Sequence, residues 1–245
     1  MASASMQDSP VRTTNLPNYQ RIGAACAIAG SLLNWIANLL HPKELLAYDS
    51  AAHFKTIAAD WSWSLDHFLF IVVAAITLWG LIALSDSLHG TPGAYLARLS
   101  AYVAIAGTAI MVIFFVLDGY GMQAAAELWL NAPASETVPA LYSALLMSKL
   151  GLGTSSVYEA WYLGLLPILY AIAMLQGGIY PKWNSLLAIL GGVLGIAAGA
   201  GFYLGGYSAA ALVSFIVAQV ILATWVFIAG IVLFRRTGAA ATLPL

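Results

Sequence analysis

The chain has 245 residues, of which 62% are hydrophobic and only 8% are charged, and its formal net charge is −1. Ordinary soluble domains carry roughly a quarter charged residues, and the 9 basic and 10 acidic residues here are too few to cover a soluble protein of this length. The composition therefore predicts a polytopic membrane protein. It excludes a basic surface for nucleic acid, and the single cysteine, Cys26, excludes an intrachain disulfide.

Two polar tails flank the apolar part of the chain. Residues 1–20 are rich in Ser, Thr, Asn and Pro and contain no apolar run, so we predict a disordered cytoplasmic tail there rather than a cleaved signal peptide. Residues 21–236 are then expected to form one membrane domain, and residues 237–245 a short cytoplasmic tail.

Uncharged intervals predict an all-α bundle of six spans in a lipid bilayer, because about 20 apolar residues cross a ~30 Å hydrocarbon core as a helix. The stretch between Lys182 and Arg235 contains no charge and is too long for one helix. We expect the turn-like sequence from Gly205 to Ser208 to divide it into the fifth and sixth spans. The first four spans are bracketed by ionisable residues: Arg21 to Lys43, His67 to Asp86, Arg98 to Asp118, and Glu159 to Lys182.

One further apolar segment, from Thr137 to Gly153, competes for a seventh span. Its charge-free interval between Glu136 and Lys149 is too short to cross the bilayer. Apolar residues recur along it at helical spacing, which predicts an interfacial or re-entrant helix between the third and fourth spans.

The basic residues favour one orientation of the six spans. With the N-terminus inside, six of the nine Lys and Arg residues lie on the inner side, and only Lys43, Lys55 and Lys149 lie outside, which fits the positive-inside rule. We therefore expect a multi-pass protein of the inner (plasma) membrane with both termini cytoplasmic. Eight of the ten acidic residues would then lie outside, which indicates an anionic outer surface.

Small residues repeat at four-residue spacing on two of the predicted spans. Such rows let a neighbouring backbone approach closely. We interpret them as packing surfaces within the bundle, with a homodimer interface as the alternative. The rows are Gly191, Gly195 and Gly199 on the fifth span, and Gly23, Ala27 and Ser31 on the first.

The topology brings ionisable residues from four spans to one membrane level. His41 closes the first span on the outer side, Asp66 and His67 open the second, Asp118 closes the third and Glu159 opens the fourth. We predict that these side chains surround a pocket on the extracytoplasmic side. A plainer interpretation also stands, since Asp66 suits the first turn of a helix, and Asp118 and Glu159 can be loop residues in water.

A polar stripe runs inward along the first span. Its residues are spaced by three, four and three positions, which places them on one helical face: Ser31, Asn34, Asn38 and His41. Polar side chains at that depth face the bundle interior and need partners there, for which Tyr162 and Gln219 are candidates. Hydrogen bonds between helices, without any ligand, are the alternative.

Tryptophan and tyrosine residues gather at the same outer level. This pattern is typical of an interfacial aromatic belt, in which the rings mark the headgroup region and form no site. The residues are Trp61, Trp63, Tyr120, Trp129, Tyr142, Tyr158, Trp161 and Tyr162.

Several kinds of chemistry fit these side chains. His41, His67, Asp118 and Glu159 offer ligands that zinc or copper accepts, but no two form a short local pair such as H-x-x-x-H, so the sequence identifies no metal or cofactor. Haem ligation by His41 and His67 fits less well, because both lie at the rim. A carboxylate in a half-dry aromatic pocket can act as a general acid on a lipid or isoprenoid.

We favour a pocket that binds or transforms a small hydrophobic or cationic ligand, such as an amphiphile held by aromatic rings and carboxylates. The catalytic candidates are Asp118 and Glu159, and the binding candidates are Asn34, Asn38, His41, Asp66, His67 and Tyr162. The alternative is a non-catalytic accessory subunit that packs on a larger membrane protein partner. The sequence contains no CxxC, H-E-x-x-H or G-x-S-x-G motif.

Four short motifs resemble those of a bacterial six-helix integral membrane family of unknown function. They are LHP at Leu40 to Pro42, DHF at Asp66 to Phe68, LDGYG at Leu117 to Gly121, and YPKW at Tyr180 to Trp183. The resemblance covers most of the chain from Arg21 to Arg236. It implies the six-helix fold and no particular activity.

Overall fold

The computed structural model describes residues 16–41 and 51–240, and this part of the chain contains helices and no strands. Six of its helices are long and apolar enough to cross a membrane, which confirms the predicted all-α bundle of six spans. The spans are Asn18–Leu40, Trp63–Ser87, Ala94–Leu130, Thr137–Gly177, Lys182–Gly205 and Ala209–Thr237.

The third and fourth long helices are each built from three pieces. The third comprises α4 (Ala94–Phe115), a π-helical turn (Val116–Gly121) and α5 (Met122–Leu130). The fourth comprises α6 (Thr137–Tyr158), a second π-helical turn (Glu159–Leu165) and α7 (Leu166–Gly177). The remaining helices are α1 (Leu16–Leu40), the short α2 (Ala51–Ala59), α3 (Trp63–Ser87), α8 (Lys182–Gly205) and α9 (Ala209–Ala240).

The helix boundaries differ from the predicted tails. Helix α1 begins at Leu16, so residues 16–20 belong to the first helix, and α9 continues past Arg236 to Ala240. The predictions for residues 1–15 and 241–245, and the predicted end of the first span at Lys43, lie outside the described residues. The turn predicted from Gly205 to Ser208 does separate α8 from α9, and Gly206 adopts a positive φ of 69° there.

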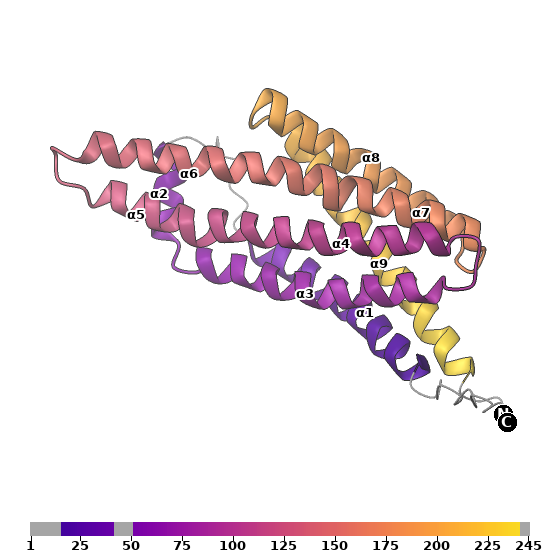
Figure 1. The fold of residues 1–245 in the computed structure, drawn as a ribbon. Coiled ribbons are helices and arrows are strands. Elements are labelled where there is room, and N and C mark those ends of the chain that lie inside the picture. The colour runs from indigo at the N-terminus through magenta and orange to yellow at the C-terminus, as the bar shows by residue number, and fades with distance from the viewer. Residues whose placement is uncertain (1–15, 42–50, 241–245) are drawn as a thin grey trace, which may run out of the picture.

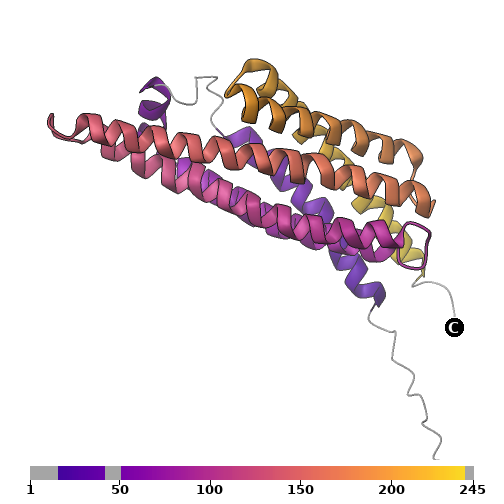
Figure 2. The same cartoon turned by 45° about the horizontal axis from the view of Figure 1, so that its top comes forward.

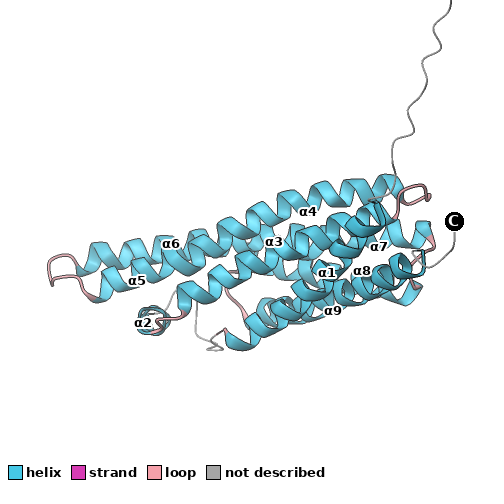
Figure 3. Ribbon diagram, turned by 90° about the horizontal axis from the view of Figure 1, so that it is seen from below, coloured by secondary structure: helices cyan, strands magenta, loops and turns pink. Residues whose placement is uncertain are grey.

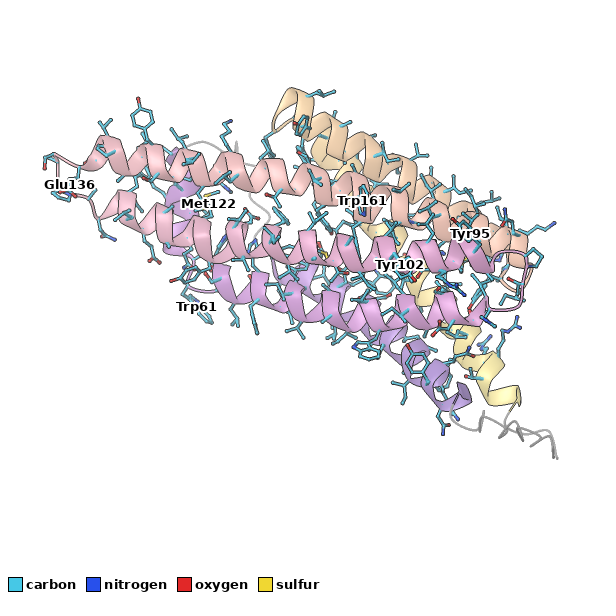
Figure 4. All side chains as sticks on the ribbon, in the orientation of Figure 1. Trp61, Tyr95, Tyr102, Met122, Glu136 and Trp161 are labelled. Atoms are coloured by element: carbon cyan, nitrogen blue, oxygen red, sulfur yellow. The ribbon has the colours of Figure 1, made fainter. Side chains whose placement is uncertain are left out.

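The third and fourth long helices exceed the thickness of a membrane. At 1.5 Å per residue their 37 and 41 residues measure about 55 and 61 Å, against about 30 Å for the hydrocarbon core. Their excess forms a hairpin of α5 and α6 that projects beyond the other helices, with Glu136 at its tip (Figures 1 and 4). We call this the hairpin end of the bundle.

The hairpin corrects one sequence prediction. The segment from Thr137 to Gly153 is not a separate interfacial or re-entrant helix, because α6 runs through Lys149 and continues into the fourth span. An apolar cluster between α2, α3, α5 and α6 holds the hairpin in place. It contains Phe54, Ile57, Trp63, Met122, Ala125, Ala126 and Ala144, and Figure 3 shows α2 beside α5 at this end of the molecule.

The remaining helices close the bundle around the membrane part of α4 and α6. Helix α1 packs on α3 and α9, while α8 packs on α9, α7 and the second π-helical turn. Figures 1 and 2 show α1 and α9 crossing the layer of α3, α4 and α6 obliquely. Helix α1 begins and α9 ends at the end of the bundle opposite the hairpin (Figure 1), as an even number of spans requires.

The two rows of small residues face the chain's own helices. A Cβ atom added at Gly195 would lie 2.5 Å from the carbonyl carbon of Leu163, and one added at Gly199 would lie 2.5 Å from the carbonyl oxygen of Ser156. On α1, a Cβ atom at Gly23 would meet the side chain of Ala83. Both rows therefore allow close packing between helices of this chain.

We expect the substitution Gly199→Ala to destabilise the bundle. The new methyl group would clash with the backbone of the fourth long helix, and overpacking of this kind costs roughly 1–3 kcal/mol. Gly153→Ala is the matched control, because no atom lies within 4 Å of its added Cβ and alanine favours a helix by roughly 1 kcal/mol. Thermal unfolding in detergent should show a lower melting temperature for Gly199→Ala alone, and equal melting temperatures would contradict this packing.

Candidate functional site

Two hydrogen bonds join α3 to the first π-helical turn at the hairpin end, and a third lies within α3. The Trp63 indole Nε1–H donates to the Asp118 carbonyl oxygen at 2.7 Å. The His67 ring bridges the two elements, with Nδ1 2.7 Å from the Trp63 carbonyl oxygen and Nε2 3.1 Å from Asp118 Oδ2. All three residues are buried, so this polar cluster is shielded from its surroundings.

The geometry determines how many protons the cluster holds. A carbonyl oxygen only accepts, so His67 Nδ1 must carry the hydrogen that it donates to Trp63. The 3.1 Å contact between Nε2 and Asp118 Oδ2 then needs one more hydrogen, either on an imidazolium or on a carboxylic acid. The pair is therefore neutral overall and holds a proton that can pass between nitrogen and oxygen.

The two candidate catalytic carboxylates each lie on a π-helical turn. Asp118 belongs to Val116–Gly121, and Glu159 opens Glu159–Leu165. Single π-helical turns insert one residue into an α-helix and occur frequently at functional sites. Glu159 is 1% exposed; its Oε1 accepts a hydrogen bond of 2.7 Å from Ser155, and its Oε2 has no hydrogen-bond partner among the described residues.

A shell of rings surrounds His67. The His41 ring lies 5.1 Å from His67 and 5.3 Å from Trp63, measured between centroids. Below them, Phe70 and Phe115 stack at 4.9 Å, and each ring also contacts His67. The structure thus brings His41, His67 and Asp118 together, as the topology predicted, and adds aromatic rings around them.

Polar residues around this cluster fix the start of α3. The Ser64 hydroxyl donates to the Gln123 side-chain oxygen on α5, and Gln123 Nε2 donates to the Asp60 carbonyl oxygen at 3.1 Å. Tyr207 lies between α8 and α9; burial raises its pKa, and the Asp118 carboxylate raises it further.

A cavity lies deeper in the bundle, beneath the phenylalanine pair. Its volume is about 70 Å³, and it is partly open to the surroundings. Most of its lining is apolar, including Phe70, Phe115, Met111 and Leu222, while its polar lining side chains are uncharged. They are Ser31, Asn34, Thr77, Tyr158, Tyr162, Gln219 and Trp225.

The predicted binding residues separate into two groups. Asn34 and Tyr162 line the cavity, together with Gln219, which the polar stripe on α1 suggested as a partner. Asn38 is exposed, and its Nδ2 donates to the Asn34 carbonyl oxygen, so it does not contribute to the cavity. Asp66 is half-buried and accepts a long hydrogen bond of 3.4 Å from Ser62.

The two carboxylates also differ in their surroundings. Asp118 pairs with His67, whereas the hydrogen bond of Glu159 is made with Ser155 on its own helix. Neither carboxylate lines the cavity. The single pocket predicted from His41, His67, Asp118 and Glu159 is therefore two features in the structure, a polar cluster and a cavity separated by Phe70 and Phe115.

Metal and haem ligation require free ligand atoms. Within residues 16–41 and 51–240, no group of three or more His, Cys, Asp or Glu side chains is arranged to hold a metal ion. Both ring nitrogens of His67 already make hydrogen bonds. A metal bound to His67 would have to break one of them.

Sequence reasoning missed several residues of this region. Trp63 and Tyr158 were assigned to an aromatic belt, but they are 4% and 2% exposed and lie inside the bundle. His53 on α2 was not considered, although its ring lies 6.0 Å from Trp63. Trp61, Tyr120 and Tyr142 do point outward, as a belt requires. The sequence places these rings near the membrane surface but does not show which side of its helix each ring occupies.

Comparison of the chain with protein-family models, with curated proteins and with solved structures found no match. The resemblance to a six-helix membrane family stays a prediction. The function must therefore be inferred from the polar cluster and the cavity.

We expect His67 and Asp118 to be energetically coupled. His67→Ala or Asp118→Ala leaves the other partner buried and unpaired, which costs roughly 1–3 kcal/mol. Because both changes break the same interaction, the double variant should be about as unstable as either single variant. Thermal unfolding of the four proteins in detergent measures the coupling.

The neighbouring carboxylate supplies the control for this cycle. Asp66 is half-buried and only weakly bonded, so Asp66→Ala should lower the melting temperature little and should add to the effect of Asp118→Ala. If the decreases in melting temperature caused by His67→Ala and Asp118→Ala add up in the double variant, the pair does not stabilise the fold.

Proposed function

We propose that this multi-pass membrane protein binds a small, largely apolar ligand in the cavity between α1, α3, α4, the fourth long helix and α9. The observation that supports the proposal is the cavity itself. Its apolar lining and its few polar groups match the usual composition of small-molecule sites. A ligand of this kind also dissolves in the bilayer, which is where the cavity lies.

Binding is better supported than chemical transformation of the ligand. Asp118 and Glu159 remain the candidate catalytic groups, but neither lines the cavity. The stacked rings of Phe70 and Phe115 contact His67 on one side and line the cavity on the other. Proton transfer from the cluster to a bound ligand would require these rings to move.

The second candidate function is that of an accessory subunit on a larger membrane complex. The projecting hairpin favours it, because α6 carries exposed apolar residues well beyond the length needed to cross a bilayer: Val138, Tyr142, Leu146 and Leu150. Here the cavity would be a consequence of packing and the hairpin would carry the function.

A cavity-filling variant separates these two functions. Ala223 lines the cavity on α9, so Ala223→Phe should occupy part of it and remove a small ligand that stays bound in mild detergent. Native mass spectrometry would report the loss of that ligand mass, with at least a tenfold reduction in occupancy. The melting temperature should not fall, because filling a cavity restores packing contacts.

Val220→Phe is the matched control, since Val220 lies one turn away on α9 and is 55% exposed. It should keep the ligand. If the wild-type protein retains a protein partner and no small ligand, and both variants keep that partner, the accessory function replaces the proposed one.

The orientation of the chain belongs to the same proposal. The positive-inside rule supports cytoplasmic termini in the inner (plasma) membrane, and so an extracytoplasmic hairpin. We expect a cysteine placed at Ala134 in the hairpin loop to react with a membrane-impermeant maleimide in intact cells. One placed at His89, in the exposed loop after α3, should react only after lysis. Both probes belong in a Cys26→Ser background, and the reverse labelling pattern would overturn this orientation.

A further inference from the structure

One residue of the cavity lining carries a buried donor that has no acceptor among the described residues. Trp225 lines the cavity, its side chain is 1% exposed, and its indole Nε1–H has no hydrogen-bond partner among the described residues. The indole nitrogen can only donate. Leaving a buried donor unpaired is unfavourable, so an acceptor from outside the protein that reaches this N–H group would be stabilising.

Trp225 lies at a different depth in the cavity from the amide side chains of Asn34 and Gln219. On α9, Gln219 lies six residues closer than Trp225 to the hairpin end, which is about 9 Å along the helix axis. Asn34 on α1 is likewise near that end, only six residues before Leu40. The amide side chains therefore lie nearer the hairpin end, and the indole lies deeper in the bundle.

The charge of the lining restricts the ligand further. Among the described residues that line the cavity there is no Asp, Glu, Lys, Arg or His. An ionised ligand group would enter a low-dielectric space without a countercharge, which is very unfavourable. The carboxylates that could balance a cation lie outside the lining.

We propose that the ligand of this cavity is an uncharged, mainly hydrocarbon molecule with a carbonyl, ether or hydroxyl oxygen that accepts a hydrogen bond from Trp225. The inference rests on the proposed function and narrows it. Of the two ligand classes expected from the sequence, it retains the hydrophobic one and excludes the cationic one. The cavity volume limits the length of the ligand's hydrocarbon chain and the number of rings that it can contain.

A pair of isosteric probes tests the acceptor. The ketone 2-tridecanone and the alkene 2-methyltridec-1-ene have nearly the same shape, but only the ketone carries an oxygen. Binding is measured in lipid nanodiscs by native mass spectrometry. The wild-type protein should bind the ketone roughly fivefold to tenfold more tightly than the alkene, since one hydrogen bond contributes about 1 kcal/mol.

The Trp225→Phe variant should bind the two probes with equal affinity, because it keeps an aromatic ring and loses the N–H group. Trp183→Phe is the matched control, as Trp183 on α8 is 57% exposed and does not line the cavity; it should keep the wild-type preference. If Trp225→Phe does not fold, benzothienylalanine at Trp225 preserves the bicyclic shape without the N–H group.

The outcomes distinguish this inference from the proposed function. If the wild-type protein binds both probes equally, or Trp225→Phe keeps the preference for the ketone, the cavity is a binding site and the acceptor inference is wrong. If the wild-type protein binds neither probe and retains no native small molecule, the proposed function fails and this inference fails with it. Selective binding of a cationic amphiphile, dodecyltrimethylammonium, would overturn the exclusion of charge.

Discussion

A polar group buried inside a membrane protein must find its partner within the protein, because the hydrocarbon around it offers none. At the hairpin end this constraint joins Trp63 and His67 on α3 to Asp118 on the third long helix. These bonds set the rotation of α3 about its own axis. That rotation places Phe70, one turn further along α3, against Phe115, and the stacked rings form the wall between the polar cluster and the cavity.

The π-helical turns allow one long helix to serve two sets of neighbours. An inserted residue shifts the apolar face of the following segment by about 100°. Before the first turn, α4 presents Met111 and Phe115 to the bundle interior, and after it α5 presents Met122 and Ala126 to α2. In the fourth long helix, the second π-helical turn joins α6 to α7. Asp118 and Glu159 lie where these changes of face occur.

The sequence predicts the number of spans well, because an uncharged interval of sufficient length reflects the cost of placing charge in hydrocarbon. It fails at Lys149, which ends the predicted interval but does not end α6, since that part of the helix packs on α5 beyond the length of the other helices. It also fails for Trp63 and Tyr158: residue type places a ring near the membrane surface, but only packing decides whether the ring faces lipid or the interior. The π-helical turns have no recognised sequence signature, so the local position of Asp118 and Glu159 could not be predicted. The proximity of His41, His67 and Asp118 could be predicted because connectivity alone brings three helix ends together.

The contrast between the cluster and the cavity supports a binding function. In the cluster, His67 and Asp118 satisfy each other and the space around them is filled by rings. In the cavity, small residues such as Gly30, Ala74 and Ala223 leave space that larger apolar side chains could fill. An unfilled space loses dispersion contacts, and Trp225 adds to that loss a donor that has no acceptor in the part of the chain that the structure describes. Proteins give up stability in this way at sites where function requires it, and a ligand that fills the space and accepts the hydrogen bond would recover both losses.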